Sequence, residues 1–158
     1  MGHKWGRIAA ATSAGALILT SCETNTDVPA TFAATVTVTG HADRASAASG
    51  VCTIGTVPVA PNDRVVILGD SGAAFAATAL EVDSIDENPD GTGVCTYTAP
   101  FEAIPENQRN YVIWMNRNFT EKSFTSDELK NGTTYRLCSS VPTDSSHGAD
   151  VLDSGCTP

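Results

Sequence analysis

The chain has 158 residues, which suits one domain, and its 18 acidic side chains outnumber nine basic ones, giving a formal net charge of −9. A surface this acidic repels phosphate groups, which argues against binding to nucleic acid or to anionic lipid headgroups. We therefore expect no nucleic-acid partner.

Residues 1–21 have the three-part layout of an export signal. Lys4 and Arg7 form a positive start, an alanine-rich apolar stretch follows over 8–19, and two small residues precede Cys22. At about 1.5 Å per residue, the apolar stretch is too short for a hydrocarbon core of roughly 30 Å. We therefore predict a cleaved signal peptide over residues 1–21 and not a membrane-spanning helix.

The letters LTSC at 19–22 resemble the lipobox of bacterial lipoproteins, in which Leu stands three residues before the modified Cys. The resemblance implies that Cys22 receives a diacylglyceryl group and becomes the first residue of the mature chain. One myristoyl chain binds a bilayer only marginally, whereas two acyl signals anchor a protein stably. We expect a lipid-anchored protein on the extracytoplasmic face of the cell membrane, with the lipid on Cys22 as its contact with the membrane.

Cleavage before Cys22 would leave 137 residues with a formal charge of −11. Residues 22–31 are polar and contain a proline, so we expect them to form the lipidated N-terminus and a flexible tether. The nine residues after Cys22 extend at most about 30 Å, which would keep the domain close to the membrane.

From Phe32 onward, short segments alternate between apolar and polar residues and are separated by Gly, Pro, Asn and Asp. This pattern predicts an all-β domain over 32–138, an antiparallel β-sandwich of immunoglobulin- or transthyretin-like general shape. The predicted strands cover 35–39, 64–68, 74–82, 94–99, 111–116 and 133–138. A short helical turn is predicted near 126–131, with Ser126 as its cap and Gly132 as its stop.

The remaining cysteines fit an oxidising compartment and are Cys52, Cys95, Cys138 and Cys156. Their even number predicts two disulfides, for which three pairings are possible. We favour Cys52–Cys95, which would join two strands, and Cys138–Cys156, which would staple the C-terminal tail at 139–158. A zinc site of Cys138, His147 and Cys156 is the alternative, but its gaps of eight residues match no compact zinc motif.

Landmarks across 51–137 resemble a small exported β-sandwich that recurs in actinobacterial secreted proteins and lipoproteins. The landmarks in this chain are Cys52, DSG at 70–72, CTY at 95–97, Pro105, YVIWM at 111–115 and SDEL at 126–129. The resemblance covers about two thirds of the mature chain, and its motifs are structural, so it implies a fold and no activity.

The letters GDSG at 69–72 also surround the nucleophile of chymotrypsin-like serine proteases, which would make Ser71 catalytic. That chemistry needs a His to take the serine proton and an Asp to orient the His. The mature chain would contain only His41 and His147, and His41 lacks the sequence context of that family. Gly72 instead suits a tight hairpin turn, so we expect no catalytic residue.

Asp86, Asn88 and Asp90 match the opening of a calcium loop, with Gly91 at its sharp turn. The twelfth position, which should be a bidentate Glu, is Tyr97. We expect a solvated hairpin loop without a metal or cofactor, and weak calcium binding is the alternative.

In YVIWM, alternate residues share a face, so Tyr111, Ile113 and Met115 point one way while Val112 and Trp114 point the other. If the first face is core, Trp114 becomes exposed and marks a candidate binding patch. The alternative is a central strand that is buried on both faces.

These features together predict a non-catalytic binding or envelope-associated module whose partner is a protein or glycan of the cell envelope. The alternatives are a small envelope hydrolase and a weak calcium-binding module that uses the loop at 86–91.

Overall fold

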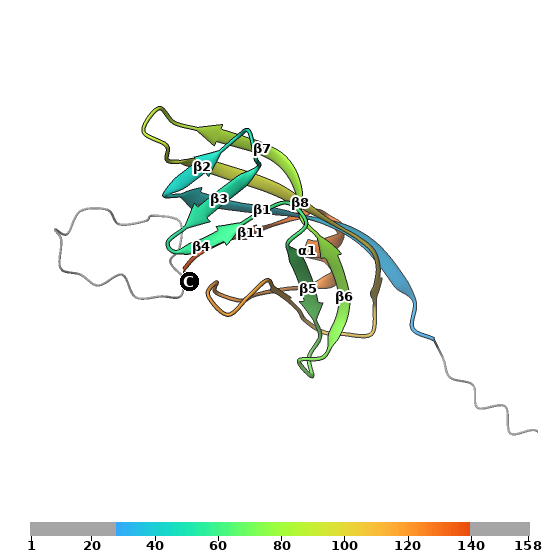
Figure 1. Cartoon of the computed structure of the whole chain (residues 1–158). Coiled ribbons are helices and arrows are strands. Elements are labelled where there is room, and N and C mark those ends of the chain that lie inside the picture. Colours follow the sequence, from blue (N-terminus) through green and yellow to red (C-terminus); the bar gives the residue numbers. More distant parts are fainter. Residues whose placement is uncertain (1–27, 140–158) are drawn as a thin grey trace, which may run out of the picture.

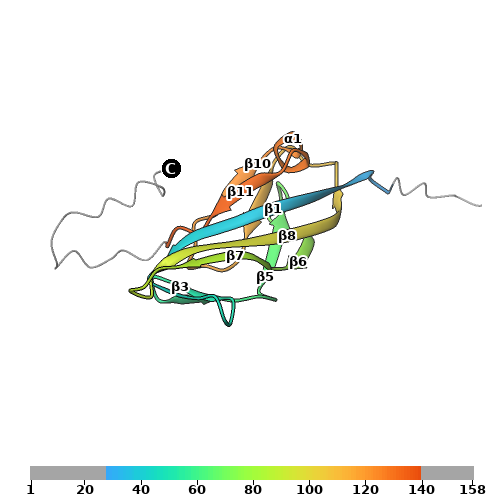
Figure 2. The same ribbon diagram turned by 90° about the horizontal axis from the view of Figure 1, so that it is seen from above.

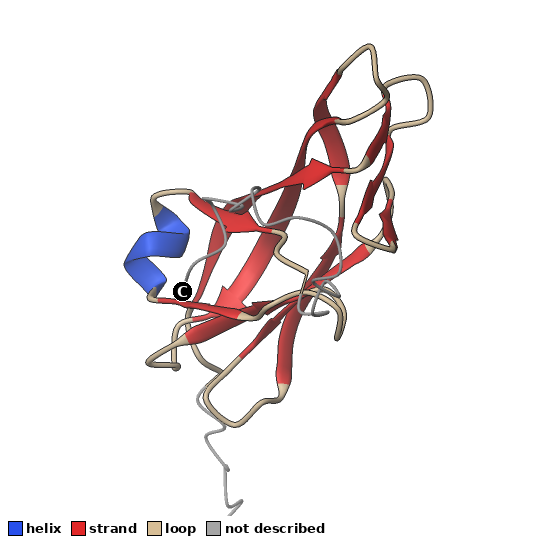
Figure 3. Cartoon of the chain, turned by 90° about the vertical axis from the view of Figure 1, so that its left-hand side faces the viewer, coloured by secondary structure: helices blue, strands red, loops and turns tan. Residues whose placement is uncertain are grey.

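The computed structural model describes residues 28–139, so Cys22, His147 and Cys156 lie outside the described residues. Within this range the chain is mostly strand with one short helix, and its strands form two four-stranded sheets and one three-stranded sheet (Figures 1 and 3). The sheets pack against one another around a shared apolar core. The predicted all-β sandwich is confirmed.

The first sheet has the strand order β11-β1-β8-β7. Its members are β1 (Thr31–Ala42), β7 (Glu81–Glu87), β8 (Gly93–Pro105) and β11 (Thr133–Arg136). β1 and β8 pair antiparallel along their whole length, from Thr31 opposite Pro105 to Ala42 opposite Gly93. β11 runs parallel to β1, which the antiparallel prediction did not include. A parallel neighbour needs a long connection, and here the rest of the domain supplies it.

The second sheet has the order β10-β9-β5-β6, and the third sheet has the order β2-β3-β4. Their members are β5 (Arg64–Leu68), β6 (Ala74–Ala79), β9 (Tyr111–Trp114), β10 (Lys122–Phe124), β2 (Arg44–Ser46), β3 (Val51–Ile54) and β4 (Val57–Val59). Seen from above, the third sheet lies beside one end of the first (Figure 2). β10 and the third sheet were not predicted, because strands of three or four residues are too short to show a period of two.

Leu80 divides the strand predicted at 74–82 into β6 of the second sheet and β7 of the first sheet. Its N–H donates to the carbonyl of Asp63 at 2.9 Å, and its carbonyl accepts from the N–H of Asn62 at 2.8 Å. Its side chain is 1% exposed. Leu80 therefore anchors the crossing of the chain from one sheet to the other, and a single continuous strand was the wrong prediction.

The predicted disulfide between Cys52 and Cys95 is confirmed. It joins β3 of the third sheet to β8 of the first sheet, and both residues are fully buried. Cys138 is also disulfide-bonded. Because Cys156 lies outside the described residues, the pairing of Cys138 with Cys156 stays a prediction.

The predicted helical turn is α1 (Ser126–Lys130), and its N-cap is Thr125 instead of Ser126. The Thr125 side chain accepts from the N–H of Glu128, and the Glu128 carboxylate accepts from the N–H of Thr125 at 2.7 Å. This reciprocal capping requires Glu three residues after the cap, which Thr125 has and Ser126 lacks. Gly132 follows with φ of 81°, which agrees with its predicted role as the stop.

All three tyrosines of the chain are buried, and each hydroxyl donates to a backbone carbonyl. The Tyr97 hydroxyl lies 2.8 Å from the Gly50 oxygen and 3.2 Å from the Val59 oxygen, which ties the first sheet to the β2–β3 turn and to β4 of the third sheet. Tyr111 bonds Pro105 at 2.6 Å, and Tyr135 bonds Thr120 at 2.9 Å. Hydrogen bonds of this kind offset the cost of burying the phenol groups.

These tyrosines predict a loss of stability in alkali. Burial, helped by the Asp63 carboxylate, raises the pKa of Tyr97 to about 12. Burial and the Glu121 carboxylate likewise raise the pKa of Tyr135 to about 12. Because an unfolded tyrosine titrates near pH 10, the free energy of unfolding should hold below about pH 10 and fall as the pH rises toward about 12. Urea unfolding midpoints across this range would measure the fall.

A Tyr97→Phe chain is the matched control for this pH dependence. It should be less stable at neutral pH by about 1 kcal/mol, through loss of the hydrogen bond, and its stability should fall less steeply above pH 10. If the free energy of unfolding of this variant fell as steeply above pH 10 as that of the parent chain, Tyr97 would not contribute to the pH dependence.

Candidate binding groove

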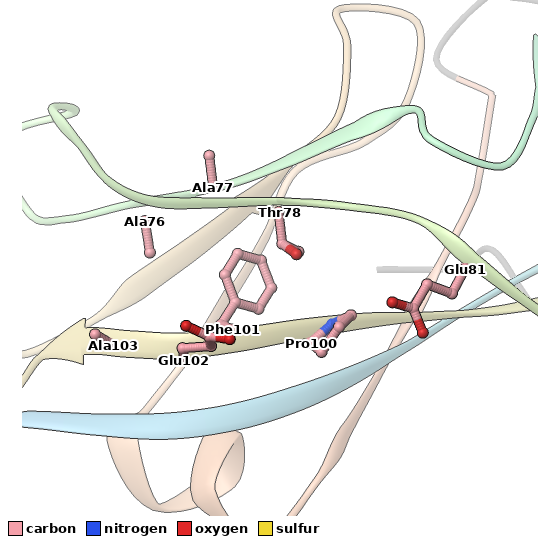
Figure 4. Close-up of a pocket in the computed structure, with 8 residues that line it drawn as sticks. All are labelled: Ala76, Ala77, Thr78, Glu81, Pro100, Phe101, Glu102 and Ala103. Atoms are coloured by element: carbon pink, nitrogen blue, oxygen red, sulfur yellow. The ribbon is translucent and has the colours of Figure 1, made fainter.

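A hollow of about 470 Å³ lies between β6 and β8 (Figure 4). Its lining residues are Ala76, Ala77 and Thr78 of β6, Glu81 of β7, and Pro100, Phe101, Glu102 and Ala103 of β8. It forms because β7 pairs with β8 only between Gly93 and Thr98, while β8 continues to Pro105. Beyond Thr98, the side of β8 that faces β6 has no strand paired to it in the described chain.

The floor and walls of the groove come from small or buried side chains. The Phe101 ring points from β8 toward β6, and Thr78 points from β6 back toward it (Figure 4). Phe101 is 4% exposed, so it acts as a packed floor, and the alanines of β6 leave open space beside it. The result is a shallow channel with an apolar base between two strands.

A β-bulge shapes the rim of the groove. Phe101 pairs with Ala34 and Ile104 pairs with Phe32, so two residues of β8 stand opposite one residue of β1. The two residues of the bulge, Glu102 and Ala103, are both exposed, which breaks the alternation of β8. Bulges are common beside binding sites because they redirect a side chain. Here the bulge exposes Glu102 at the rim.

A second hollow of about 500 Å³ adjoins the groove across β8 and reaches α1. It shares Pro100, Phe101 and Glu102 with the groove and includes Lys130. The Lys130 ammonium lies 2.7 Å from Glu106 Oε1, and this hydrogen bond is the main cause that raises the pKa of Lys130. Because this ammonium is paired with Glu106, the carboxylates of Glu102 and of Glu81 dominate the charge at the groove.

The GDSG segment forms the predicted hairpin turn between β5 and β6. Gly72 has φ of 74°, and its N–H donates to the Gly69 carbonyl at 2.8 Å. Ser71 is exposed in this turn, which belongs to the second sheet, whereas the exposed His41 lies in β1 of the first sheet opposite Val94. The structure therefore places the two residues of the hydrolase alternative in different sheets.

Asp70 has a structural role that the sequence analysis did not assign. Its carboxylate accepts from the N–H of Arg109 at 3.0 Å and of Asn110 at 3.2 Å. Its own N–H donates to the side chain of Gln108 at 3.1 Å. Asp70 thus fastens the β5–β6 turn to the loop that leads into β9.

Removing this carboxylate should cost measurable stability. We expect Asp70→Ala to lower the free energy of unfolding by about 1–2 kcal/mol, because two backbone N–H groups lose a charged acceptor at an exposed site. Urea denaturation measures the loss, and Ser71→Ala in the same turn is the control, with a change near zero. Equal effects of the two variants would contradict this role of Asp70.

The predicted hairpin loop is present but spans 88–92, because β7 continues to Glu87, and its polar groups bond within the loop. Asn88 N–H donates to the Thr92 carbonyl at 2.7 Å. Asp90 Oδ1 accepts from the Thr92 hydroxyl at 2.7 Å and from its N–H at 3.0 Å, and these bonds lower the pKa of Asp90. Asp86 lies in β7 opposite Val94. Within residues 28–139, no group of three or more His, Cys, Asp or Glu is arranged to hold a metal ion.

The two faces predicted for β9 are observed. Tyr111 and Ile113 are fully buried and Met115 nearly so, whereas Trp114, which pairs with Val66 of β5, is half-buried. Trp114 therefore offers a partner only part of its indole ring. Its role as a binding patch stays a prediction.

The comparisons with known proteins found no match to this chain among protein-family models, curated proteins or solved structures. The groove is therefore interpreted from its own residues. In the part of the chain from 28 to 139, no helix is both long enough and apolar enough to span a bilayer.

Proposed function

We propose that the protein is a lipid-anchored exported module that binds a protein of the cell envelope without catalysis. The observation that carries this proposal is the groove between β6 and β8. It combines an apolar base, the edge of β6 that no described strand pairs with, and two carboxylates at the rim. A protein segment can use all three features through packing, main-chain hydrogen bonds and opposite charge.

The position of β1 supports a close attachment to the membrane. The first strand begins at Thr31, so eight residues separate it from Cys22 and their reach is at most about 30 Å. Thr31 pairs with Pro105, near the groove, whereas the other end of β1 is about 40 Å away. A lipid on Cys22 would thus hold the groove at the membrane-proximal end of the domain.

The anchor is tested with a Cys22→Ala chain in a bacterium that processes lipoproteins. We expect the parent chain to partition into the detergent phase and remain with membranes, and the variant to lose both properties. A variant that remains acylated would disprove the lipobox interpretation.

The binding role is tested by placing a photo-crosslinking residue at Ala77, on β6, in living cells that export the chain. The matched control carries it at Ala48, which is exposed in the turn between β2 and β3. We expect a discrete envelope protein to be captured from position 77 and not from position 48. Capture that is equal at the two positions, or absent at both, would contradict a role for the groove.

A further inference from the structure

The two four-stranded sheets end in four edge strands, and three of these are protected against pairing with another chain. β10 and β11 have only three and four residues. β7 is longer, but it has an irregular register between Val82 and Ser84 and carries four carboxylates, those of Glu81, Asp83, Asp86 and Glu87. Shortness, charge and bulges are the usual means by which proteins prevent pairing at sheet edges.

β6 has none of these protections over most of its length. Its six residues read AFAATA, with no charge and no proline, and it pairs with β5 alone in the described chain. The pairing is regular from Arg64 opposite Ala79 to Ile67 opposite Ala76. Alternate N–H and C=O groups along an edge strand point away from its one neighbour. β6 therefore presents about 20 Å of uncharged pairing edge above the groove.

The part of β8 across the groove is a poorer pairing edge. Pro100 has no N–H to donate, and the bulge at Glu102 and Ala103 interrupts the ladder. We therefore assign main-chain pairing to β6 and side-chain contacts to β8.

We propose that β6 accepts an added β-strand, an extended segment of a partner protein in which Lys or Arg flanks small or β-branched residues. The inference rests on the proposed function and names the chemistry of its partner. Backbone pairing to 74–79 supplies affinity, and side chains over the Phe101 floor set the spacing. Glu81 and Glu102, both exposed at the rim, select for positive charge.

Charge also favours a basic segment over a second copy of this chain. A second copy would bring the same rim carboxylates to the interface, and with them the same formal charge, −11 for a chain cleaved before Cys22. Like charges that face each other across an interface suppress association, whereas a basic segment neutralises the rim.

The test uses the full exported chain in detergent and a capped probe peptide, Lys-Val-Thr-Val-Thr-Val-Lys. Hydrogen exchange with mass spectrometry should show new amide protection over 74–79 when the peptide binds. Fluorescence anisotropy at low salt should show binding roughly tenfold weaker for the same peptide with Glu in place of Lys.

Two sets of variants separate the edge from the charge. Ala77→Lys with Ala79→Lys places two cations on the edge and should weaken probe binding by roughly tenfold, while Ala48→Lys leaves it unchanged. Glu81→Gln with Glu102→Gln removes only charge and should weaken binding severalfold, while Glu121→Gln does not. These residues are exposed, so unchanged melting temperatures confirm that the variants fold.

Three results would overturn the added strand. They are probe binding without protection over 74–79, equal binding of the acidic peptide, and a dimer of the free chain that Ala77→Lys dissociates, which would identify a second copy as the occupant. A partner crosslinked from position 77 without this protection would retain the proposed binding role and reject only strand addition.

Discussion

Changing both Cys52 and Cys95 to Ala should lower the free energy of unfolding by about 4 kcal/mol, the largest single effect we expect in this domain. The two residues are separated by 43 positions, and a link across that length removes much of the conformational freedom of the unfolded chain. The bond also joins the third sheet to the first, so its loss should loosen the third sheet.

Urea denaturation of the chain measures this loss, and hydrogen exchange locates it. Both cysteines are changed so that no unpaired buried thiol remains. The control is Val51→Ala on the same strand as Cys52, which should lower the free energy of unfolding by about 1 kcal/mol or less because Val51 is half-buried. A loss below about 1 kcal/mol in the double variant would mean that packing and the Tyr97 hydrogen bonds suffice to hold the third sheet.

Leu80→Ala should cost about 3 kcal/mol, because its side chain is 1% exposed and truncation leaves a cavity between the two sheets. The backbone hydrogen bonds of residue 80 to Asn62 and Asp63 do not need the side chain, so the lost stability measures the side-chain packing where the chain crosses between the sheets. We also expect faster amide exchange in both β6 and β7, since Leu80 connects them.

The control for Leu80→Ala is Leu80→Met, which keeps nearly the same volume and should cost less than about 1.5 kcal/mol. Unfolding midpoints in urea compare the two variants. Similar losses for both, or a loss in Leu80→Ala confined to β7, would show that the side chain does not connect the two sheets.

Much of the first sheet could be predicted because its long strands carry many alternating residues. Val36 and Val38 of β1 and Tyr97 and Ala99 of β8 are all fully buried at the alternate positions that the pattern indicated. The Cys52–Cys95 pairing was also predicted, although β3, the strand that carries Cys52, was not among the predicted strands. The break at Leu80 had no local signal, because an apolar residue fits both a continuous strand and a crossing between sheets.

The groove was not predicted, because its parts come together only through the crossing of the sheets. Ala77 and Phe101 belong to different sheets, and no spacing rule relates them. Two weak signals were present in the sequence. The uncharged run AFAATA could have indicated an unprotected edge. The two residues between Phe101 and Ile104, where strict alternation allows only one, could have indicated a bulge.

Because Thr31 pairs with Pro105 near the groove, a tether before Thr31 would lower the affinity that a partner needs at β6. A chain tethered through the short segment before Thr31 would search for its partner within a thin layer above the bilayer. If the partner is held in the same layer, their effective concentration reaches the millimolar range for short flexible linkers. Weak, rapidly reversible pairing would then be enough for high occupancy, and release from the membrane would end the interaction without any change in the groove.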